Sequence, residues 1–127
     1  MKDIAVDMVV MEGERHTGVL LSGEMDLVSA PPIRGHLYAL VSKRPLVLDV
    51  SGVSFFDAEG LRIIAATARR GLQCGTGVAL VGMRPFAAQM FRILRMDEAV
   101  PLCSSTQEAL WCLLPPTDED IAAWLDA

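Results

Sequence analysis

Short apolar runs alternate along the chain with segments in which apolar residues recur every three or four positions. The short runs are typical of β-strands and lie at Ile4–Met11, Thr17–Leu21, Leu46–Val50, Val78–Val81 and Ala99–Leu102. The helically spaced segments predict helices that begin at or near Pro31, Asp57, Pro85 and Ser105. This alternation predicts an α/β fold, with a mixed, mostly parallel sheet of about five strands and about four α-helices. The first two strands are expected to form a hairpin.

The strand Leu46–Val50 and the segment after it are central to the functional interpretation. Its nearly continuous apolar run suits a strand that is covered on both faces. A turn is expected at Ser51–Gly52, followed by a second apolar piece, Val53–Phe56. Asp57 is then placed to cap a helix. The carboxylates of Asp57 and Glu59 are therefore expected at a helix N-terminus and at the carboxyl edge of a sheet, where partners dock in open α/β folds.

Capping and amphipathic patterns refine the other elements. A loop is expected at Gly23–Asp26, and Ser29 is placed to cap the helix after it. Ser105 and Glu108 have capping-box spacing. The buried stripe of the helix that starts at Asp57 is predicted to be Leu61, Ile64, Ala65, Ala68 and Leu72. In the helix that starts at Pro85, the predicted inward side chains are Phe86, Met90, Ile93 and Leu94, and the predicted outward ones are Arg84, Arg92 and Arg95.

Length and charge narrow the class of protein. The chain has 127 residues, 52% of them hydrophobic, which suits one domain with a substantial core. No window approaches the roughly 18 uninterrupted apolar residues of a membrane span, and the N-terminus lacks a signal-peptide layout. The net charge is −5, and no basic stripe with interleaved aromatic residues occurs. We therefore expect a cytoplasmic protein that contacts neither membrane nor nucleic acid directly.

The tail, residues 115–127, differs from the body, residues 1–114. It holds four acidic and no basic residues, whereas the body is close to neutral. Thr117 and Asp120 have capping-box spacing, and Ile121, Trp124 and Leu125 fall on one face of the predicted short amphipathic helix. About three turns of helix are marginal alone in water. Two alternatives follow: the tail packs on the body, or its apolar face awaits a partner.

Residues for catalysis or metal binding are not grouped in the sequence. The two histidines, His16 and His36, fall in different elements, no GxxxxGK loop occurs, and the cysteines have no CxxC spacing. We therefore expect neither an enzyme nor a metal or cofactor site. Cys74, Cys103 and Cys112 are interpreted as small buried hydrophobic residues in a reducing cytosol. The alternative is a regulatory disulfide between Cys74 and Cys112, since both fall near helix ends.

The segment VLDVSGVSFFDAEGLRII resembles the central signature of the STAS domain, the family of the stand-alone bacterial anti-sigma factor antagonists. That signature consists of an apolar strand ending in Asp, a "sGV.F.D" stretch, two small residues that usually include the regulatory Ser or Thr, and Gly-Leu. Two further blocks match in order, VLLSGEMDLVSA at Val19–Ala30 and VALVG followed by ILRMDEAVP at residues 78–101. The resemblance spans roughly Val6 to Leu113 and implies the STAS fold for residues 1–114.

The sequence departs from this signature at the phosphorylation-equivalent position. Where family members carry the acceptor hydroxyl immediately before the glycine, this chain has Glu59, preceded by Ala58. Glu59 either imitates the phosphorylated state that does not bind the partner, or leaves the protein outside kinase control and binding constitutively. We favour the second hypothesis, because one carboxylate lacks the geometry and the near-double charge of a phosphate. An ordinary helix residue without regulatory meaning is the third alternative.

The resemblance also implies a partner and a mechanism. Family members bind a serine kinase-type anti-sigma factor, and the freed sigma factor joins RNA polymerase, as in bacterial stress responses. The partner-binding residues expected by this similarity are Glu24, Asp26, Ser51, Asp57, Ala58, Glu59, Gly60, Leu61 and Arg62. Leu61 is expected to supply an apolar anchor. The alternative function is a STAS-fold scaffold or ligand-sensing regulatory module, and the expected oligomeric state is a monomer or weak dimer.

Overall fold

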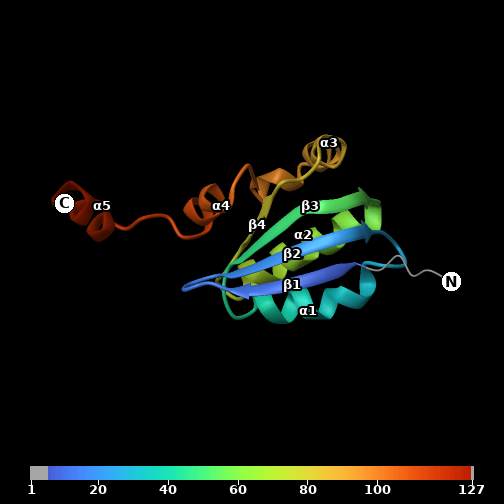
Figure 1. The fold of residues 1–127 in the computed structure, drawn as a ribbon, viewed down its shortest axis with the longest axis horizontal. Helices are drawn as coiled ribbons and strands as arrows, with labels where there is room; N and C mark the ends of the chain where they lie inside the picture. The colour runs from blue at the N-terminus through green and yellow to red at the C-terminus, as the bar shows by residue number, and fades with distance from the viewer. Residues whose placement is uncertain (1–5, 127) are drawn as a thin grey trace.

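The computed structural model describes residues 6–126 and contains one five-stranded sheet with strand order β1-β2-β3-β4-β5 (Figure 1). The strands are β1 (Asp7–Glu12), β2 (Thr17–Met25), β3 (Leu46–Phe56), β4 (Val78–Val81) and β5 (Leu102–Cys103). The helices are α1 (Pro31–Val41), α2 (Ala58–Gln73), α3 (Pro85–Ile93), α4 (Thr106–Leu113) and α5 (Asp118–Asp126), with a 3₁₀ turn at Met96–Glu98. The pair β1–β2 is antiparallel and the other pairs are parallel. The predicted mixed α/β sheet and the hairpin are confirmed.

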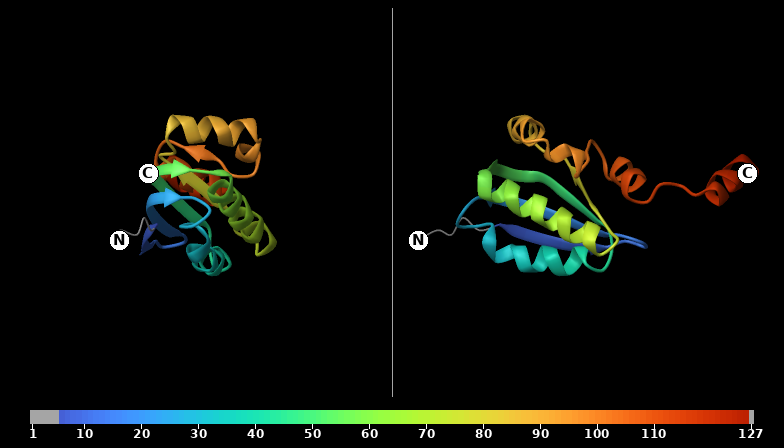
Figure 2. Two further views of the ribbon diagram at one scale, coloured as in Figure 1. Left: turned by 90° about the vertical axis from the view of Figure 1, so that its right-hand side faces the viewer. Right: turned by 180° about the vertical axis from the view of Figure 1, so that it is seen from behind.

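Helices cover both faces of the sheet, α1 and α2 on one face and α4 on the other (Figures 1 and 2). Alternate residues of a strand point to opposite faces, so β3 contributes Leu48 and Val50 to the larger core and Val47 to the smaller one. Leu37 of α1 and Ile64 of α2 are fully buried in the larger core. A strand covered in this way needs apolar residues on both faces, which explains the nearly continuous apolar run.

Two of the predicted strand ends are wrong. β3 runs without interruption through Ser51–Gly52, where a turn was expected, and β2 includes Gly23–Met25, which was expected to be a loop. The two strands pair along this stretch, Ser22 with Gly52, with irregularities in register that accommodate the small residues. The hydrogen bonds of the ladder therefore outweigh the local turn preference of Ser-Gly. As a result, β2 and β3 project well beyond the short strand β4.

Of the three caps predicted for helices of the body, two are confirmed and one is wrong. Asp57 caps α2 and Ser105 caps α4, each accepting a hydrogen bond from the backbone amide three residues on. The N-cap of α1 is Ala30, without a side-chain cap, and not Ser29. β5 lies at Leu102–Cys103 instead of Ala99–Leu102, because a 3₁₀ turn occupies Met96–Glu98. Ile4, at the start of the first predicted strand, lies outside the described residues, which show strand from Asp7.

Helix α3 presents the opposite face to the one predicted. Its buried residues are Ala87, Ala88 and Phe91, whereas Phe86, Met90, Ile93 and Leu94 are exposed. The fully buried Phe91 ring enters the larger core, and the two alanines allow the helix backbone to approach it closely. One large aromatic side chain has thus set the rotation of the helix. Leu72, predicted to be on the buried stripe of α2, is also exposed.

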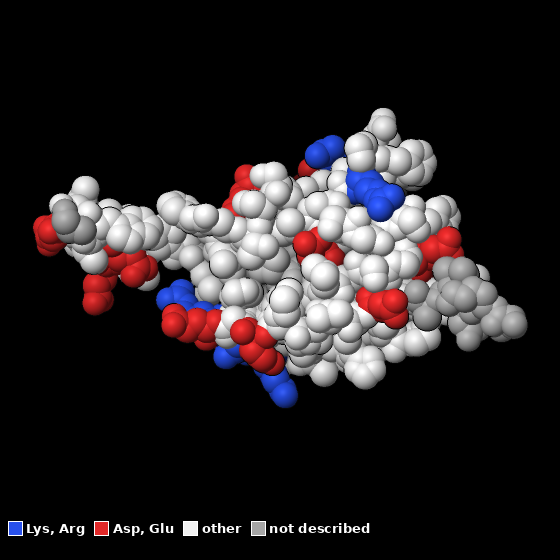
Figure 3. All heavy atoms as spheres, in the orientation of Figure 1, with Lys and Arg blue, Asp and Glu red and all other residues white. Residues whose placement is uncertain are grey.

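The acidic tail forms the predicted amphipathic helix, α5, which projects at one end of the molecule (Figures 1 and 2). Its first turn is capped reciprocally: the Thr117 hydroxyl accepts from the Asp120 amide at 3.1 Å, and the Asp120 carboxylate accepts from the Thr117 amide at 2.9 Å. Trp124 stacks on Trp111 of α4 with ring centroids 5.9 Å apart. No described residue of α5 is buried, so the body leaves most of its apolar face uncovered. In Figure 3 this end of the molecule shows only acidic charged side chains.

Candidate functional site

Asp57 joins two segments at the carboxyl ends of β2 and β3. Its Oδ1 accepts a hydrogen bond from the Gly60 amide at 3.0 Å and so caps α2, while Oδ2 accepts from the Leu27 amide at 2.9 Å. The backbone amide of Asp57 donates to the Met25 carbonyl at 3.2 Å. One carboxylate therefore fixes the loop after β2 against the first turn of α2. We call the surface formed by residues 24–28 and 55–62 the α2 edge.

Gly60 is buried beneath this edge because α2 begins directly against the end of β2. A Cβ atom at this position would overlap the carbonyl oxygen of Met25 and lie 2.8 Å from its Cβ. Gly60 and Leu61 were both predicted to contact a partner. Leu61 is only 3% exposed and belongs to the larger core, so its predicted role as an apolar anchor is wrong. Its position after the capping turn directs the side chain inward, beneath the sheet.

The exposed apolar side chains at this edge come from the loop after β2 and from the end of β3. Val28 is 81% exposed, and Leu27 and Phe55 are also exposed. Sequence reasoning missed all three, although Leu27 and Val28 stand in the GEMDLVSA block that was matched to the family. An Asp followed by two apolar residues in a loop was the available signal. Exposed apolar residues within a charged rim are typical of binding surfaces.

Asp26 organises the loop that holds Leu27 and Val28. Its Oδ1 accepts hydrogen bonds from the Ser29 amide at 2.7 Å and from the Val28 amide at 3.1 Å. The hydrogen bond from the Ser29 backbone is the main cause that lowers the pKa of Asp26 below its ordinary value of 3.8. Asp26 therefore stabilises the turn after β2 and also places a negative charge at the α2 edge.

Glu59 lies in the first turn of α2 and is paired with Arg62 on the next turn. The Glu59 Oε1 and the Arg62 guanidinium are 2.6 Å apart, and the Glu59 side chain is 21% exposed. The carboxylate also lies near the positive end of the helix dipole. Ala58 is exposed beside it. The negative charge of Glu59 is therefore paired with a positive charge of the same helix.

The structure brings most, but not all, of the predicted partner-binding residues together. Glu24 pairs with Phe55 at the end of the β2–β3 ladder and lies beside Asp26. Ser51 lies six residues before Asp57 on an extended strand, a separation of about 20 Å. Its backbone and hydroxyl donate to Asp49, and its carbonyl accepts from Arg84. Ser51 is therefore placed at the end of β4 and away from the α2 edge.

The cysteines lie apart from this edge. Cys103 is buried in β5, as predicted, whereas the predicted burial of the other two is wrong. Cys74 is exposed at the C-cap of α2, and Cys112 is exposed on α4. The Cys112 side chain lies close enough to that of Cys103 to influence its titration. Burial, together with the neighbouring Cys112, raises the pKa of the Cys103 thiol to about 11. Cys112 thus has a close thiol neighbour that the sequence did not indicate.

Two further features limit what the described residues can do. Within residues 6–126, no helix is both long enough and apolar enough to cross a bilayer. Across the same residues, no three His, Cys, Asp or Glu side chains are grouped so that they could hold a metal ion.

We compared the sequence and the fold of this chain with those of known proteins. The family described as "Mlab, STAS domain" matches residues 8–104. The anti-sigma-F factor antagonist RsfB of Mycobacterium tuberculosis is 30% identical over 112 residues, which cover 84% of this chain and 90% of RsfB. The crystal structure of an anti-sigma factor antagonist from Mycobacterium paratuberculosis is similar with a TM-score of 0.76 and 29% identity, covering 88% of this chain and 97% of that one. The phosphorylated form of the Bacillus cell fate determinant SpoIIAA shares the fold, with a TM-score of 0.64, 16% identity, and coverage of 84% and 96%.

Proposed function

This chain belongs to the STAS domain family, and we propose that it acts as an anti-sigma factor antagonist. The observation that carries this proposal is the 30% identity to an anti-sigma-F factor antagonist over 84% of the chain. The exposed α2 edge supports it, because a regulator that acts by binding needs an accessible and pre-organised surface.

We infer that the α2 edge is the surface that binds a serine kinase-type anti-sigma factor. It carries the carboxylates of Glu24, Asp26, Asp57 and Glu59 around exposed apolar side chains, with Arg62 as the basic residue of α2's first turns. A basic partner surface would complement it. Binding would occupy the anti-sigma factor and release its sigma factor to RNA polymerase. This partner exchange requires no covalent chemistry from the antagonist.

The pairing of Glu59 with Arg62 favours constitutive binding over imitation of phosphate. A phosphoserine would add nearly two negative charges at this position, whereas Glu59 adds one charge that is already paired with Arg62 at 2.6 Å. Neither Ala58 nor Glu59 has a hydroxyl that a kinase could phosphorylate. We therefore propose that the protein lies outside control by phosphorylation at this position.

A binding titration against the host's kinase-type anti-sigma factors tests both proposals, with wild type beside Glu59→Ser and Glu59→Ala. Wild type should bind equally well with and without ATP. Glu59→Ser should bind without ATP and lose binding, by at least about tenfold, when ATP allows its phosphorylation. Glu59→Ala should bind in both conditions.

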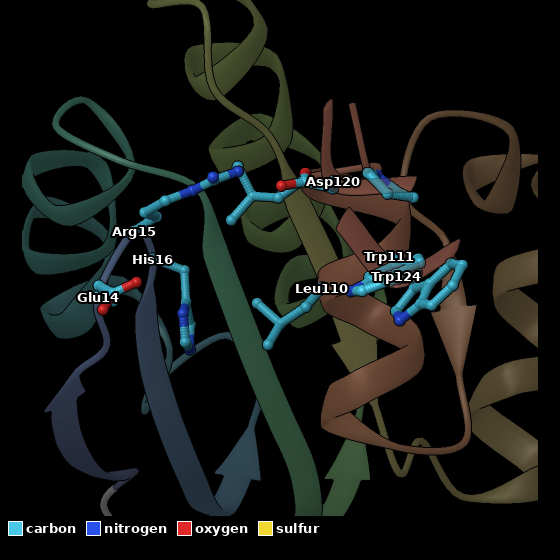
Figure 4. A pocket seen from close by; sticks show the side chains of 9 residues that line it. Glu14, Arg15, His16, Leu110, Trp111, Asp120 and Trp124 are labelled. Atoms are coloured by element: carbon cyan, nitrogen blue, oxygen red, sulfur yellow. The ribbon is translucent and has the colours of Figure 1, made fainter. Parts of the chain in front are cut away.

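Other outcomes have distinct meanings. Failure of wild type with recovery in Glu59→Ala would show that Glu59 imitates phosphate, and would contradict constitutive binding. Failure of all three variants would favour the alternative of a scaffold or ligand-sensing module. The structure supports that alternative through an open pocket of about 350 Å³ between the β1–β2 turn, α4 and α5 (Figure 4). Aromatic side chains of Trp111 and Trp124 and charged ones of Arg15 and Asp120 line it.

We propose redox regulation through Cys112 as a further property, with Cys74 or Cys103 as the second thiol. In the reduced native protein, an alkylating reagent at neutral pH should modify Cys74 and Cys112 and spare Cys103. The reason is that the thiolate is the nucleophile and burial holds the Cys103 pKa at about 11, so its modification rate should rise as the pH approaches that value. Rapid labelling of all three thiols at neutral pH would contradict this.

The same peptide map, repeated after mild oxidation, identifies the bond. Peroxide would convert two thiols to one disulfide and two molecules of water. A Cys74–Cys112 link would agree with the sequence-based prediction, and a Cys103–Cys112 link would agree with the thiol contact in the structure. Three intact thiols would contradict redox regulation through a disulfide.

A further inference from the structure

Helix α3 exposes an apolar stripe that no element of the described chain covers. Phe86 is 74% exposed and Ile93 is 64% exposed, with Met90 between them. The spacing 86, 90, 93 places the three on one helical face, opposite the buried face of Ala87, Ala88 and Phe91. Contiguous exposed apolar side chains of this kind mark interaction sites more often than scattered ones do.

Three exposed arginines lie around this stripe, and Asp97 and Glu98 in the adjacent 3₁₀ turn offset part of their charge. Arg84 precedes α3, Arg92 lies in its last turn, and Arg95 follows it, and all three side chains are exposed. Arg95 is partly compensated by Glu98 at 3.2 Å. An occupant of the stripe should therefore be apolar and acidic. We call the surface of Phe86, Met90, Ile93 and these arginines the α3 face.

Helix α5 has the complementary chemistry. Ile121, Trp124 and Leu125 share one exposed face, and Leu125 is 80% exposed. The tail holds four acidic and no basic residues, among them Asp118, which flanks the apolar face in the first turn. The helix is also pre-organised for contact, because the Thr117–Asp120 cap and the Trp111–Trp124 stack order it before any partner arrives. Arg15 extends toward Asp120 and adds to this anchoring (Figure 4).

The two helices of one chain do not meet each other. α5 projects at one end of the long axis, and α3 lies toward the other end (Figures 1 and 2). α5 follows α4 after only the short segment 114–117, which limits how far it can move away from α4. The acidic apolar helix that fits the α3 face is therefore the α5 of another molecule.

We propose that this protein self-associates through α3 of one copy packed on α5 of a second copy. The contact buries Phe86, Met90 and Ile93 against Ile121 and Leu125 and pairs the arginines of the α3 face with the acidic residues of α5. It uses none of the residues of the α2 edge, so it does not depend on the proposed anti-sigma factor antagonism. Because the charge complementarity is exposed, association should weaken as salt increases.

Sedimentation velocity of the full chain over a range of concentrations tests this contact. Wild type should associate, and Ile93→Glu should raise the dissociation constant at least about tenfold by placing a charge in the apolar stripe. Leu72→Glu is the matched control, because Leu72 of α2 is 64% exposed like Ile93 but lies outside the contact. It should associate like wild type.

Charge reversal identifies the two surfaces. Arg92→Glu and Asp118→Arg should each weaken association alone, and an equimolar mixture of the two variants should associate more strongly than either one, because opposite charges meet again. A wild type that sediments as a monomer at every concentration would overturn the proposal. Association that is unaffected by Ile93→Glu, or a mixture no stronger than its components, would also overturn it.

Discussion

Gly60→Ala is expected to destabilise the protein by about 3 kcal/mol or more, the upper range for overpacking a filled site. The new methyl group would overlap the Met25 carbonyl oxygen, so α2 must move away from the end of β2. That movement also breaks the hydrogen bond between the Gly60 amide and Asp57, which is 3.0 Å long in the structure. Urea denaturation measures the loss directly.

Gly35→Ala is the matched control for that substitution. Gly35 lies within α1, and nothing approaches within 4 Å of the position of a Cβ atom there. Alanine removes backbone freedom from the unfolded chain, so this variant should be more stable than wild type by about 0.5–1 kcal/mol. Equal stability of Gly60→Ala and wild type would show that α2 does not need its close approach to Met25.

Asp57→Ala is expected to cost about 2.5–4 kcal/mol and to weaken partner binding beyond what the lost stability explains. The cap of α2 contributes about 1 kcal/mol, and a hydrogen bond to a charged group about 1.5–3 kcal/mol. The substitution removes both contributions, because the Gly60 and Leu27 amides each lose the carboxylate oxygen that accepts their hydrogen bond. The loop that carries Leu27 and Val28 then loses its side-chain attachment to the start of α2.

Asp57→Asn separates the cap from the loop attachment. Asparagine caps helices nearly as well as aspartate, but its amide offers one acceptor oxygen where the carboxylate offers two. This variant should lose roughly half as much stability as Asp57→Ala does. Its Leu27 or Gly60 amide should exchange with solvent faster than in wild type, which hydrogen exchange can resolve by residue. Wild-type stability and binding in Asp57→Ala would contradict the central role of this carboxylate.

Both substitutions affect how the start of α2 is held against the end of β2. Gly60 allows the helix to begin against β2, and Asp57 then uses both carboxylate oxygens to hold the adjacent loop. The partner-binding surface that we propose is rigid because both its segments start from the ends of paired strands. A regulator that exchanges partners without covalent chemistry benefits from such pre-organisation, since less conformational entropy is lost on binding.

The sequence determined those features of the protein that depend on local chemistry. Neighbouring residues were enough to identify the alternation of strands and helices and the caps at Asp57, Ser105 and Thr117. They also showed that position 59 carries a glutamate and no hydroxyl. Each depends on interactions within a few positions of the chain, such as a side-chain oxygen and an amide three residues later. The family resemblance rested on the same local blocks.

Which faces of these elements are available depends on contacts between segments that are far apart in the sequence. Ser51–Gly52 became strand because β2 supplied hydrogen bonds along its whole length, and Leu61 entered the core because α2 begins against Met25. The α3 stripe faces solvent because Phe91, on the opposite face of the helix, is the side chain that packs into the larger core. Burial depends on contacts between segments far apart in sequence, and helical periodicity alone cannot rank two apolar faces of one helix. The surfaces that we propose for the anti-sigma factor and for a second copy both depend on which side chains this packing leaves exposed.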